Sequence, residues 1–473
     1  MRAGWSVARI IICGGGIIGL CAATMLARDG HDVTLLEADT AHVPSTHGEA
    51  WASWDRPGVS QFTQPHGLLP RFRMVADEEL PDLTDRLMAA GCTSFDLIHE
   101  HAFPPGITDR TPRPGDHALR QVTGRRPVAE WVIAGMAAAE PTLSIRRGVR
   151  ARELITGQSA VAGIPHVTGV RLMSGEDIHA DLVVDAMGRR SPACRWIVEA
   201  GGRDPIEETE NSKFTYYSQF FSGPTQPRRI GPGLMPMGLF SILTILGDNN
   251  TWSITLYAPA GNQALRAFRD PATFHRVVAA CPRQAHWLDG SPITPILPMA
   301  GIGDRHRRFV IDGQPVVTGF AAVGDASICT NPAAGRGVSL GVLHAQVLRR
   351  TVRAHIGDPQ AFATAYDTET ERQVTPFYRS QLAADRIRIA EMNALADGAP
   401  LPAPHPVLSK FFAAAYRDAD VFRAMIESYM CLTPLEEVLA MPYVAAKMAE
   451  FSGPVPPPPV AFDRDRLSTL LAG

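Results

Sequence analysis

The first forty residues show the clearest change in hydrophobic pattern along the chain. Residues 10–27 contain no charged side chain, but Gly14, Gly16 and Gly19 interrupt the run. A polar segment, 28–32, follows, and residues 33–37 are again mostly apolar. A continuous apolar helix would predict a signal peptide or a membrane span, whereas strand, glycine turn, helix, turn and strand predict a buried βαβ unit. We therefore predict no transmembrane segment here, nor in the later, more polar parts of the chain.

Helical patterns flank this unit and return later in the chain. Apolar residues recur at helical spacing around residues 74–90, and Pro127 lies in the first turn of a further predicted helix. Residues 337–353 predict another helix, and the chain is mostly helical from residue 360 onward. The proline-rich segment 454–459 predicts an extended polyproline spacer before a last short helix.

Strand patterns dominate the middle of the chain. Residues 214–221, 239–246 and 252–257 are rich in aromatic and β-branched side chains. The sequence Asp248-Asn249-Asn250 between the last two predicts a hairpin, so these segments predict an antiparallel sheet. Residues 182–186 and 315–323 are apolar runs that predict buried strands.

Composition and charge exclude several classes of protein. The chain has 473 residues, with 45 basic and 48 acidic side chains and a net charge of −3, so it lacks the basic excess typical of nucleic-acid binding. Its seven cysteines are dispersed and never spaced as CxxC, which argues against a disulfide framework and against a zinc site. We predict a cytoplasmic protein without a metal site.

Gly14-x-Gly16-x-x-Gly19 lies between the predicted strand and helix, and Glu37 ends the second strand. The first glycine permits a tight turn, the second lets the backbone approach a pyrophosphate, and the third lets helix and strand pack closely. Glu37 can accept hydrogen bonds from a ribose diol. The pattern predicts a dinucleotide site, but it does not distinguish NAD from FAD.

A second motif follows the predicted strand 315–323. It consists of Asp325, Pro332, Gly335, Gly337 and Val338. A carboxylate at the end of a buried strand can bind the hydroxyls of a polyol, and the two glycines let a flat ring system approach the backbone. The helix that begins there directs its N-terminus toward any negative charge on the ring.

These residues resemble the second flavin motif of the FAD-dependent monooxygenases related to p-hydroxybenzoate hydroxylase. In that family the residue matching Asp325 binds the ribityl chain and the residue matching Pro332 lies beside the flavin ring. The resemblance covers most of residues 7–355 and implies FAD as the cofactor. It implies an α/β fold with a Rossmann-like FAD-binding domain of the glutathione-reductase type, an antiparallel-sheet substrate domain and a helical C-terminal region.

The implied domains are discontinuous in sequence. We expect residues 1–75, 118–195 and 300–355 to form the FAD-binding domain. Residues 76–117 and 196–299 are expected to form the substrate domain, and residues 356–473 the helical C-terminal region, whose segment 375–473 matches no family pattern.

Two weaker matches lie between the main motifs. Arg126 with Glu130 resembles a helix start at which the family's arginine contacts the cofactor, although Ala129 replaces the family's leucine. A solvated arginine in a first helical turn is the alternative interpretation. Residues 181–191 resemble the family's Asp-Gly segment for pyrophosphate and NAD(P)H, but Met187 replaces the aspartate. We therefore expect slow NAD(P)H oxidation without substrate, or electrons supplied by a separate flavin reductase.

The loop from Arg56 to His66 is similar to a stretch in bacterial FAD-dependent epoxidases that act on polyketides. Ser60 and Gln64 depart from that pattern. The resemblance implies that Arg56 and Gln61 contact FAD and that His66, the candidate catalytic residue, lies near the substrate; an exposed loop without a role is the alternative.

The expected reaction is the hydroxylation or epoxidation of a hydrophobic small molecule by O2, through a flavin C4a-(hydro)peroxide. Such chemistry mainly requires a dry, shaped cavity. The aromatic and Met-rich sheet supplies candidate substrate-binding residues: Tyr216, Phe220, Met237 and Trp252. Each of these side chains alone would equally fit an ordinary core.

Other functions remain open at this point. An FAD-dependent reductase or dehydrogenase acting on a prenyl or polyketide double bond is the rival enzyme. A flavin-dependent halogenase is disfavoured because no lysine precedes Lys213. A binding protein with the architecture of guanine-nucleotide dissociation inhibitors is a third interpretation, although both flavin motifs here are intact.

Overall fold

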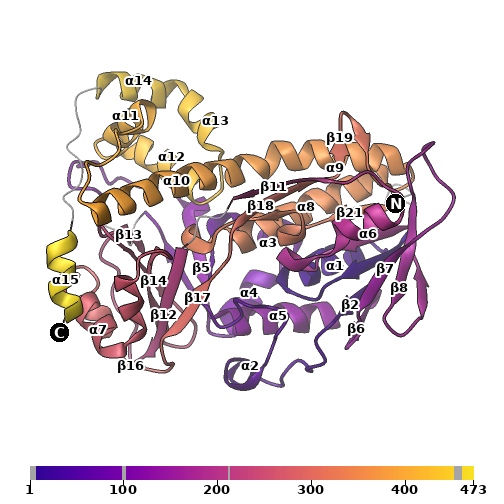
Figure 1. Ribbon diagram of the computed structural model, residues 1–473, viewed down its shortest axis with the longest axis horizontal. Coiled ribbons are helices and arrows are strands. Elements are labelled where there is room, and N and C mark those ends of the chain that lie inside the picture. The colour runs from indigo at the N-terminus through magenta and orange to yellow at the C-terminus, as the bar shows by residue number, and fades with distance from the viewer. Residues whose placement is uncertain (1–6, 99–102, 211–213, 452–460, 473) are drawn as a thin grey trace.

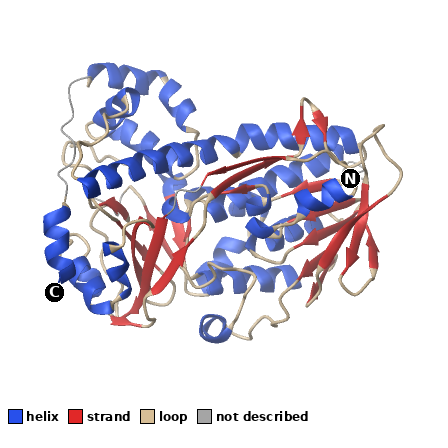
Figure 2. Cartoon of the chain, in the orientation of Figure 1, coloured by secondary structure: helices blue, strands red, loops and turns tan. Residues whose placement is uncertain are grey.

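Five parallel strands form the central sheet in a computed structural model that describes residues 7–98, 103–210, 214–451 and 461–472. Their order across the sheet is β21-β10-β1-β2-β6 (Figures 1 and 2). The strands are β1 (Arg9–Cys13), β2 (Asp32–Glu37), β6 (Leu143–Arg147), β10 (Leu182–Asp185) and β21 (Phe320–Ala322). Segments that are far apart in sequence are therefore neighbours in one sheet.

The βαβ unit expected from the first forty residues is confirmed. Helix α1 (Ile17–Arg28) connects the parallel pair β1 and β2. Helices α5 (Arg126–Ala138) and α8 (Gly337–His355) pack against α1. Because this unit is buried on several sides, it is apolar without spanning a membrane. Within the described ranges, every helix is too short or too polar to cross a bilayer.

A six-stranded antiparallel sheet stands beside the parallel one (Figure 2). Its strands are β12 (Phe214–Ser222), β13 (Leu234–Pro236), β14 (Ser241–Leu246), β15 (Thr251–Pro259), β16 (Ser291–Pro292) and β17 (Leu297–Ala300). The predicted hairpin joins β14 to β15, and Asn249 and Asn250 in its turn have φ values of 48° and 55°. Helix α7 (Pro271–Ala279) packs on one face of the sheet, which leaves the other face toward the parallel sheet.

Smaller elements connect the two sheets. The short strands are β3 (Gly67–Leu68), β4 (Thr93–Asp96), β5 (Arg120–Thr123), β7 (Ala151–Thr156), β8 (Val167–Leu172), β9 (Asp177–His179), β11 (Ile206–Glu210), β18 (Asp304–Arg308), β19 (Val310–Ile311), β20 (Gln314–Pro315) and β22 (Ile328–Cys329). The remaining helices of the first 200 residues are α2 (His47–Ser53), α3 (Pro70–Glu79), α4 (Leu83–Ala89) and α6 (Ala193–Glu199).

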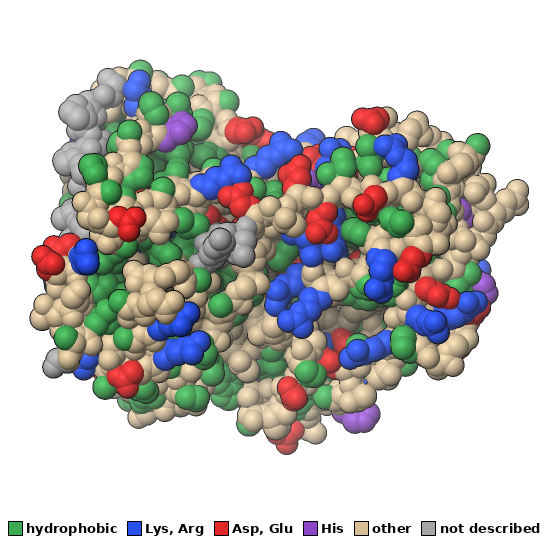
Figure 3. Space-filling model, in the orientation of Figure 1, with side chains coloured by type: hydrophobic (Ala, Val, Ile, Leu, Met, Phe, Trp, Pro, Cys, Tyr) green, Lys and Arg blue, Asp and Glu red, His purple; other side chains and the backbone are tan. Residues whose placement is uncertain are grey.

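The C-terminal region is helical, as expected. Its helices are α9 (Pro359–Gln373), α10 (Thr375–Asp397), α11 (Pro406–Ala415), α12 (Ala419–Tyr429), α13 (Leu435–Ala440), α14 (Pro442–Glu450) and α15 (Arg464–Ala472). Helices α9 and α10 run along one side of the molecule, and basic and acidic side chains alternate on their outer surface (Figures 1 and 3). Helices α11 to α14 enclose a small core of their own. The expected polyproline spacer lies outside the described residues.

Two predicted elements differ from those observed. The helix expected around residues 74–90 is two helices, α3 and α4, separated at Pro81, which has no N–H to continue the first helix. The strand expected over 315–323 is confined to β21, because Gly319 adopts φ 69° directly before it. A Cβ atom at Gly319 would lie 2.2 Å from Val167 O, so the chain turns closely past β8 there.

Candidate functional site

The glycine turn after β1 and the turn that carries Asp325 after β21 lie at the same edge of the parallel sheet. Strand β10 runs between them. Ala186 N donates to Cys13 O at 2.8 Å, and Val323 N donates to Asp185 O at 2.9 Å. Since the carboxyl ends of parallel strands meet at one edge, both turns border the crevice in which such sheets bind ligands.

Ile18, in the first turn of α1, connects the two turns directly. A Cβ atom at Gly324 would lie 3.2 Å from Ile18 Cγ2, and one at Gly341 in α8 would lie 2.6 Å from Ile18 Cδ1. Gly16 is two residues from Ile18 in sequence, and Asp325 follows Gly324. The structure therefore places the two motifs beside each other at this edge of the sheet.

The three glycines of the first motif have different surroundings. A Cβ atom at Gly14, whose φ is 112°, would lie 2.4 Å from Ala186 O, and one at Gly19 would lie 1.9 Å from Gly14 O. A Cβ atom at Gly16 would meet no atom within 4 Å. Gly14 and Gly19 thus permit close backbone packing, whereas Gly16 borders open space at the N-terminus of α1, where a pyrophosphate fits.

Glu37 closes over this turn. Its Oε2 accepts hydrogen bonds from Gly15 N at 2.9 Å and from Arg56 Nη2 at 2.6 Å, and its Oε1 accepts from Asp39 N at 2.8 Å. A carboxylate has about four acceptor sites. Glu37 therefore retains one for a ribose hydroxyl, and the protein holds the carboxylate in place.

Arg56 lies beneath the glycine turn, with its side chain 1% exposed. It donates to Glu37, to Asp39 Oδ2 at 2.9 Å and to Glu130 Oε1 at 2.5 Å. Its Nη2 also donates to Gly15 O at 3.2 Å. Because every nitrogen of the guanidinium has a protein partner, this geometry supports a positioning role for Arg56 rather than direct contact with a ligand.

Arg126 and His66 continue the buried network. Glu130 Oε2 accepts from Arg126 Nε at 3.2 Å, and Arg126 Nη1 lies 3.1 Å from His66 Nε2. His66 Nδ1 lies 2.8 Å from Gln64 O. Burial, reinforced by the Arg126 charge, lowers the pKa of His66 to about 3. A neutral ring with both nitrogens engaged is placed to orient Arg126 and offers no free nitrogen to a substrate.

Asp325 lies among three arginines. Burial raises its pKa, while the charges of Arg126, Arg305 and Arg189 oppose that rise. Arg126 thus links the first motif, through Glu130 and Arg56, to the second motif at Asp325.

The rest of the second motif forms the turn into α8. Pro332 begins a short 3₁₀ turn, Gly335 adopts the left-handed φ of 66°, and α8 starts at Gly337 and Val338. A Cβ atom at Gly335 would meet nothing within 4 Å, and one at Gly337 would first meet Thr330 Oγ1 at 4.0 Å. The backbone is therefore open to a flat group at the N-terminus of α8.

The residues present fit FAD. Gly16 and Gly335 face open space, and two buried polar atoms beside the site, Thr330 Oγ1 and Gln64 Oε1, have no hydrogen-bond partner. Gln64 Nε2 lies 3.5 Å from Leu297 O of β17, which places this side chain between the loop and the antiparallel sheet. A ligand carrying both a diphosphate and a polar ring would use the glycine turns and the two unpartnered atoms.

Gln61 lies on the same loop as Arg56. It is half-buried, and its Oε1 accepts from Ser60 Oγ at 3.1 Å. Gln61 therefore makes no hydrogen bond to Arg56, Glu37 or Glu130 among those described, and its contact with FAD stays a prediction.

The antiparallel sheet divides the four expected substrate-binding residues between its two faces. Tyr216 and Phe220 lie on the face toward the parallel sheet, where the Tyr216 hydroxyl donates to Asn331 Oδ1 and Phe220 packs on Trp51 of α2, with ring centroids 5.0 Å apart. Met237 and Trp252 lie in the core with α7, on the other face. We therefore no longer place Met237 and Trp252 in the substrate site.

Sequence reasoning did not identify several residues at the site. Asp39 holds Arg56, and Arg147 pairs with Glu37 across β2 and β6. Burial lowers the pKa of Arg147, and the Arg56 charge acts in the same direction. A basic residue at the end of a predicted strand could have indicated a site for a negatively charged group. Only the strand order of the folded sheet, however, shows that Arg147 lies beside Glu37.

Several known proteins are similar to this chain. Residues 9–190 match the family model described as FAD dependent oxidoreductase. "Protein Rv3254" of Mycobacterium tuberculosis is 25% identical over 469 residues, which are 93% of each chain. The FAD-dependent monooxygenase cfoG of Aspergillus candidus is 29% identical over 201 residues, 40% of this chain and 39% of that one.

A solved structure extends the likeness to the fold. PqsL of Pseudomonas aeruginosa, described as a probable FAD-dependent monooxygenase, is 16% identical with a TM-score of 0.59, covering 83% of this chain and 97% of that one. Residues 9–190 are therefore an FAD-dependent oxidoreductase domain, and the chain as a whole shares the fold of PqsL.

Proposed function

We propose that the protein is an FAD-dependent monooxygenase that hydroxylates or epoxidises a hydrophobic small molecule. The observation that carries this proposal is the convergence of Gly16 and Asp325, joined through Ile18, at the carboxyl edge of the parallel sheet. Bound there, FAD would supply the electron transfer and the activation of O2. We propose the discontinuous domain division given above and a glutathione-reductase type of FAD-binding domain as its framework.

The chain's own residues would bind and orient the cofactor. Gly14 and Gly19 would shape the turn so that the pyrophosphate lies beside Gly16 at the N-terminus of α1, and Glu37 would accept a hydrogen bond from the adenosine ribose. Asp325 would bind the ribityl chain, and the start of α8 would stabilise negative charge on the flavin ring. Arg56, Glu130 and Arg126 would hold these groups in register.

The substrate would lie against the face of the antiparallel sheet that bears Tyr216 and Phe220. Leu243, Ile245 and Met299 on the same face are half-buried, whereas the strand residues facing α7 are almost fully buried. The apolar side chains of this face would exclude water and orient an apolar molecule, while hydroxyl groups between them, such as those of Ser218 and Thr255, hydrogen-bond to each other.

The electron source is NAD(P)H or a separate flavin reductase. Met187, where the family has aspartate, is half-buried, and its N–H donates to Asp185 Oδ1 at 2.9 Å. We propose that NAD(P)H oxidation is slow until substrate binds. Rapid consumption of NADPH by the FAD-loaded protein alone would contradict this.

The decisive test is isotope incorporation. FAD-loaded protein is reduced without oxygen, mixed with ¹⁸O₂ and a panel of phenols and polyketide-type alkenes, and the products are analysed by mass spectrometry. One ¹⁸O atom per product supports the monooxygenase. A product two hydrogens heavier without ¹⁸O supports the alternative reductase acting on a double bond, and a protein that binds no FAD overturns both.

A further inference from the structure

Helix α10 carries an unusual group of buried polar side chains against the second flavin motif. Asp385 is 5% exposed, Gln381 is 2% exposed, and Arg336, in the loop before α8, is 5% exposed. Each has one polar atom without a hydrogen-bond partner: Asp385 Oδ2, Gln381 Oε1 and Arg336 Nε. Unpaired polar atoms in a protein interior are destabilising, and their coincidence at one place points to a ligand.

These three side chains are neighbours. Gln381 Nε2 donates to Asp385 Oδ1 at 2.9 Å. Arg336 Nη1 donates to Phe377 O at 3.3 Å and to Ser380 Oγ at 3.0 Å, which are on the turn of α10 next to Gln381. The Arg336 charge acts electrostatically on Asp385. The three unpartnered atoms therefore belong to side chains that meet along two neighbouring turns of α10.

The group borders the site already described. Ala333, three residues before Arg336, packs with Tyr216 and Tyr257 of the antiparallel sheet and with Met392 of α10. The outer boundary is Tyr429 of α12, 42% exposed, whose ring lies 5.4 Å from the Arg336 guanidinium carbon. The group thus lies between the second flavin motif, the aromatic sheet face and solvent.

We propose that Arg336, Gln381 and Asp385 form a polar subsite that binds a phenolic or enolic hydroxyl group of the substrate. The subsite deepens the proposed monooxygenase function and rests on it. It assigns to α10, in the C-terminal region, a role in substrate recognition.

The chemistry of the three atoms selects a hydroxyl. Asp385 Oδ2 and Gln381 Oε1 accept hydrogen bonds, and Arg336 Nε donates one. A hydroxyl group donates to Gln381 Oε1 and accepts from Arg336, and it also accepts from Asp385 when that side chain is protonated, so that all three atoms are paired. A protonated amine cannot accept from Arg336, and a carboxylate would be repelled by ionised Asp385, so neither satisfies the whole set.

The charge state of Asp385 suits this role. Burial, together with the nearby Asp304 charge, raises its pKa to about 7. Near neutral pH the protonated form, which donates a hydrogen bond, and the ionised form, which accepts one, are therefore about equally populated. It can receive the proton of a bound phenol as that group ionises, while Arg336 stabilises the resulting oxyanion.

The test compares two naphthalene probes, which differ by one methyl group on the oxygen, in FAD-loaded protein. The ligand 2-naphthol has the hydroxyl group, and 2-methoxynaphthalene cannot donate a hydrogen bond. We expect the wild-type protein to bind 2-naphthol about tenfold more tightly, measured by the change in flavin absorbance on titration. Asp385→Asn and Gln381→Met should reduce that ratio toward one, whereas Arg379→Gln, on the outward face of α10 with a side chain 70% exposed, should leave it unchanged.

A stability measurement separates binding from a structural role. Because Asp385 Oδ2 makes no hydrogen bond, Asp385→Asn should leave the thermal midpoint at pH 8 unchanged or raise it. The subsite is overturned if Asp385→Asn lowers the thermal midpoint as much as Asp116→Asn does. It is also overturned if protein that holds FAD binds both probes equally tightly, or binds neither. A chain that does not bind FAD overturns the proposed function instead, and the stability comparison still decides whether Asp385 is a structural group.

Discussion

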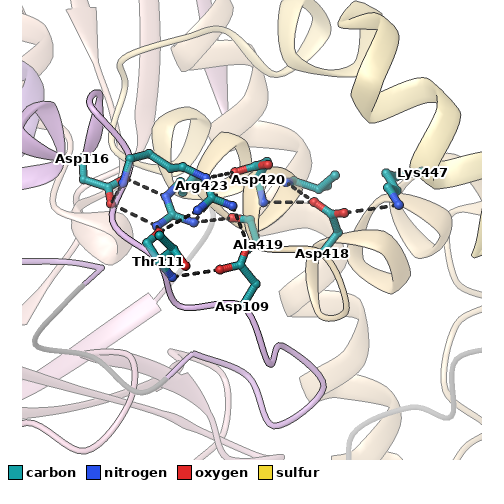
Figure 4. Close-up of polar contacts among 10 residues, drawn as sticks. Asp109, Thr111, Asp116, Asp418, Ala419, Asp420, Arg423 and Lys447 are labelled. Atoms are coloured by element: carbon teal, nitrogen blue, oxygen red, sulfur yellow. Dashed lines mark hydrogen bonds and ion pairs between the residues drawn. The ribbon is translucent and has the colours of Figure 1, made fainter.

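Two buried arginine–aspartate groups attach the C-terminal helices to the rest of the molecule, and they differ in completeness. At the first, Arg423 of α12 donates to Asp116 Oδ1 at 2.6 Å and to Asp116 Oδ2 at 3.0 Å, and to Thr111 O at 3.1 Å (Figure 4). At the second, Arg336 and Asp385 each retain an unpartnered atom. The complete group fixes architecture, whereas the incomplete group is suited to binding.

Burial is the same at both places, so it does not explain the difference. The Arg423 and Asp116 side chains are 7% and 5% exposed, close to the values for Arg336 and Asp385. Buried ion pairs offset their desolvation only when geometry and additional hydrogen bonds are good. The Arg423 group meets this condition within the protein, and the α10 group would meet it only with a ligand.

The largest effect is expected at the complete group. Arg423→Met leaves Asp116 buried without its partner, which should lower the free energy of local opening of α12 by about 3–5 kcal/mol. Hydrogen exchange of the α12 amides measures this. The double variant Asp116→Asn with Arg423→Met should recover part of the loss, because no buried charge remains. A loss below about 1 kcal/mol would contradict a structural role for the pair.

The ionisation of Asp385 should make the stability of the folded protein depend on pH. Its pKa of about 7 in the folded protein lies above the value of about 3.9 in an unfolded chain. The folded state therefore binds the proton more tightly, and this contribution to stability is full at low pH and is lost as pH rises through the interval between the two values. The charges of Asp304 and Glu210 raise the pKa of Asp385, and the charge of Arg336 lowers it.

Asp385→Asn removes that dependence. The variant should become more stable relative to the wild-type protein as pH rises from about 4 to about 7, by about 1.4 kcal/mol for each unit of pKa shift. Thermal midpoints of both proteins across this range measure the difference. Parallel profiles would show that Asp385 has an ordinary pKa and would remove the contrast with Asp116.

A related contrast, between a glycine surrounded by protein atoms and one that borders open space, occurs in the glycine turn after β1. Gly16→Ala places a methyl group where no protein atom lies within 4 Å, so the fold should be unaffected while FAD binding weakens by about tenfold. Gly19→Ala would place its methyl group 1.9 Å from Gly14 O and should instead disturb the turn itself. Fluorescence titration with FAD, alongside the thermal midpoint, distinguishes the two results. Equal loss of stability in both variants would contradict the open space at Gly16.

The parts of the site that follow local pattern were predictable from sequence. Glycine spacing, a strand ending in Asp325 and the helix at Gly337 each arise within a few residues, and parallel strand order brings them together. The α10 group joins residues 331–336 to residues 377–385 and follows no local motif. Its unpartnered atoms exist only once the tertiary structure is formed.

The two faces of the antiparallel sheet show a second limit. Aromatic residues occupy both alternating sets of β12, so composition alone does not show which set faces the cofactor. Trp252 is directly opposite Phe221 in the observed register, and that pairing places it on the face toward α7. Register depends on the strand partner as well as on the strand, and so the sequence alone did not place Trp252 on the face toward α7.

The smallest effect is expected at the exposed edge of the complete group. Lys447 of α14 lies 3.5 Å from Asp418 Oδ2 (Figure 4). It also lies 2.9 Å from Glu450 Oε2, and its side chain is 36% exposed. Solvent screens such pairs, so Lys447→Met should change the free energy of α12 opening far less than Arg423→Met does. Added salt should reduce even this difference, whereas it should leave the Arg423→Met effect nearly constant. An effect of Lys447→Met as large as that of Arg423→Met would mean that charge alone, and not a completed set of buried hydrogen bonds, attaches these helices.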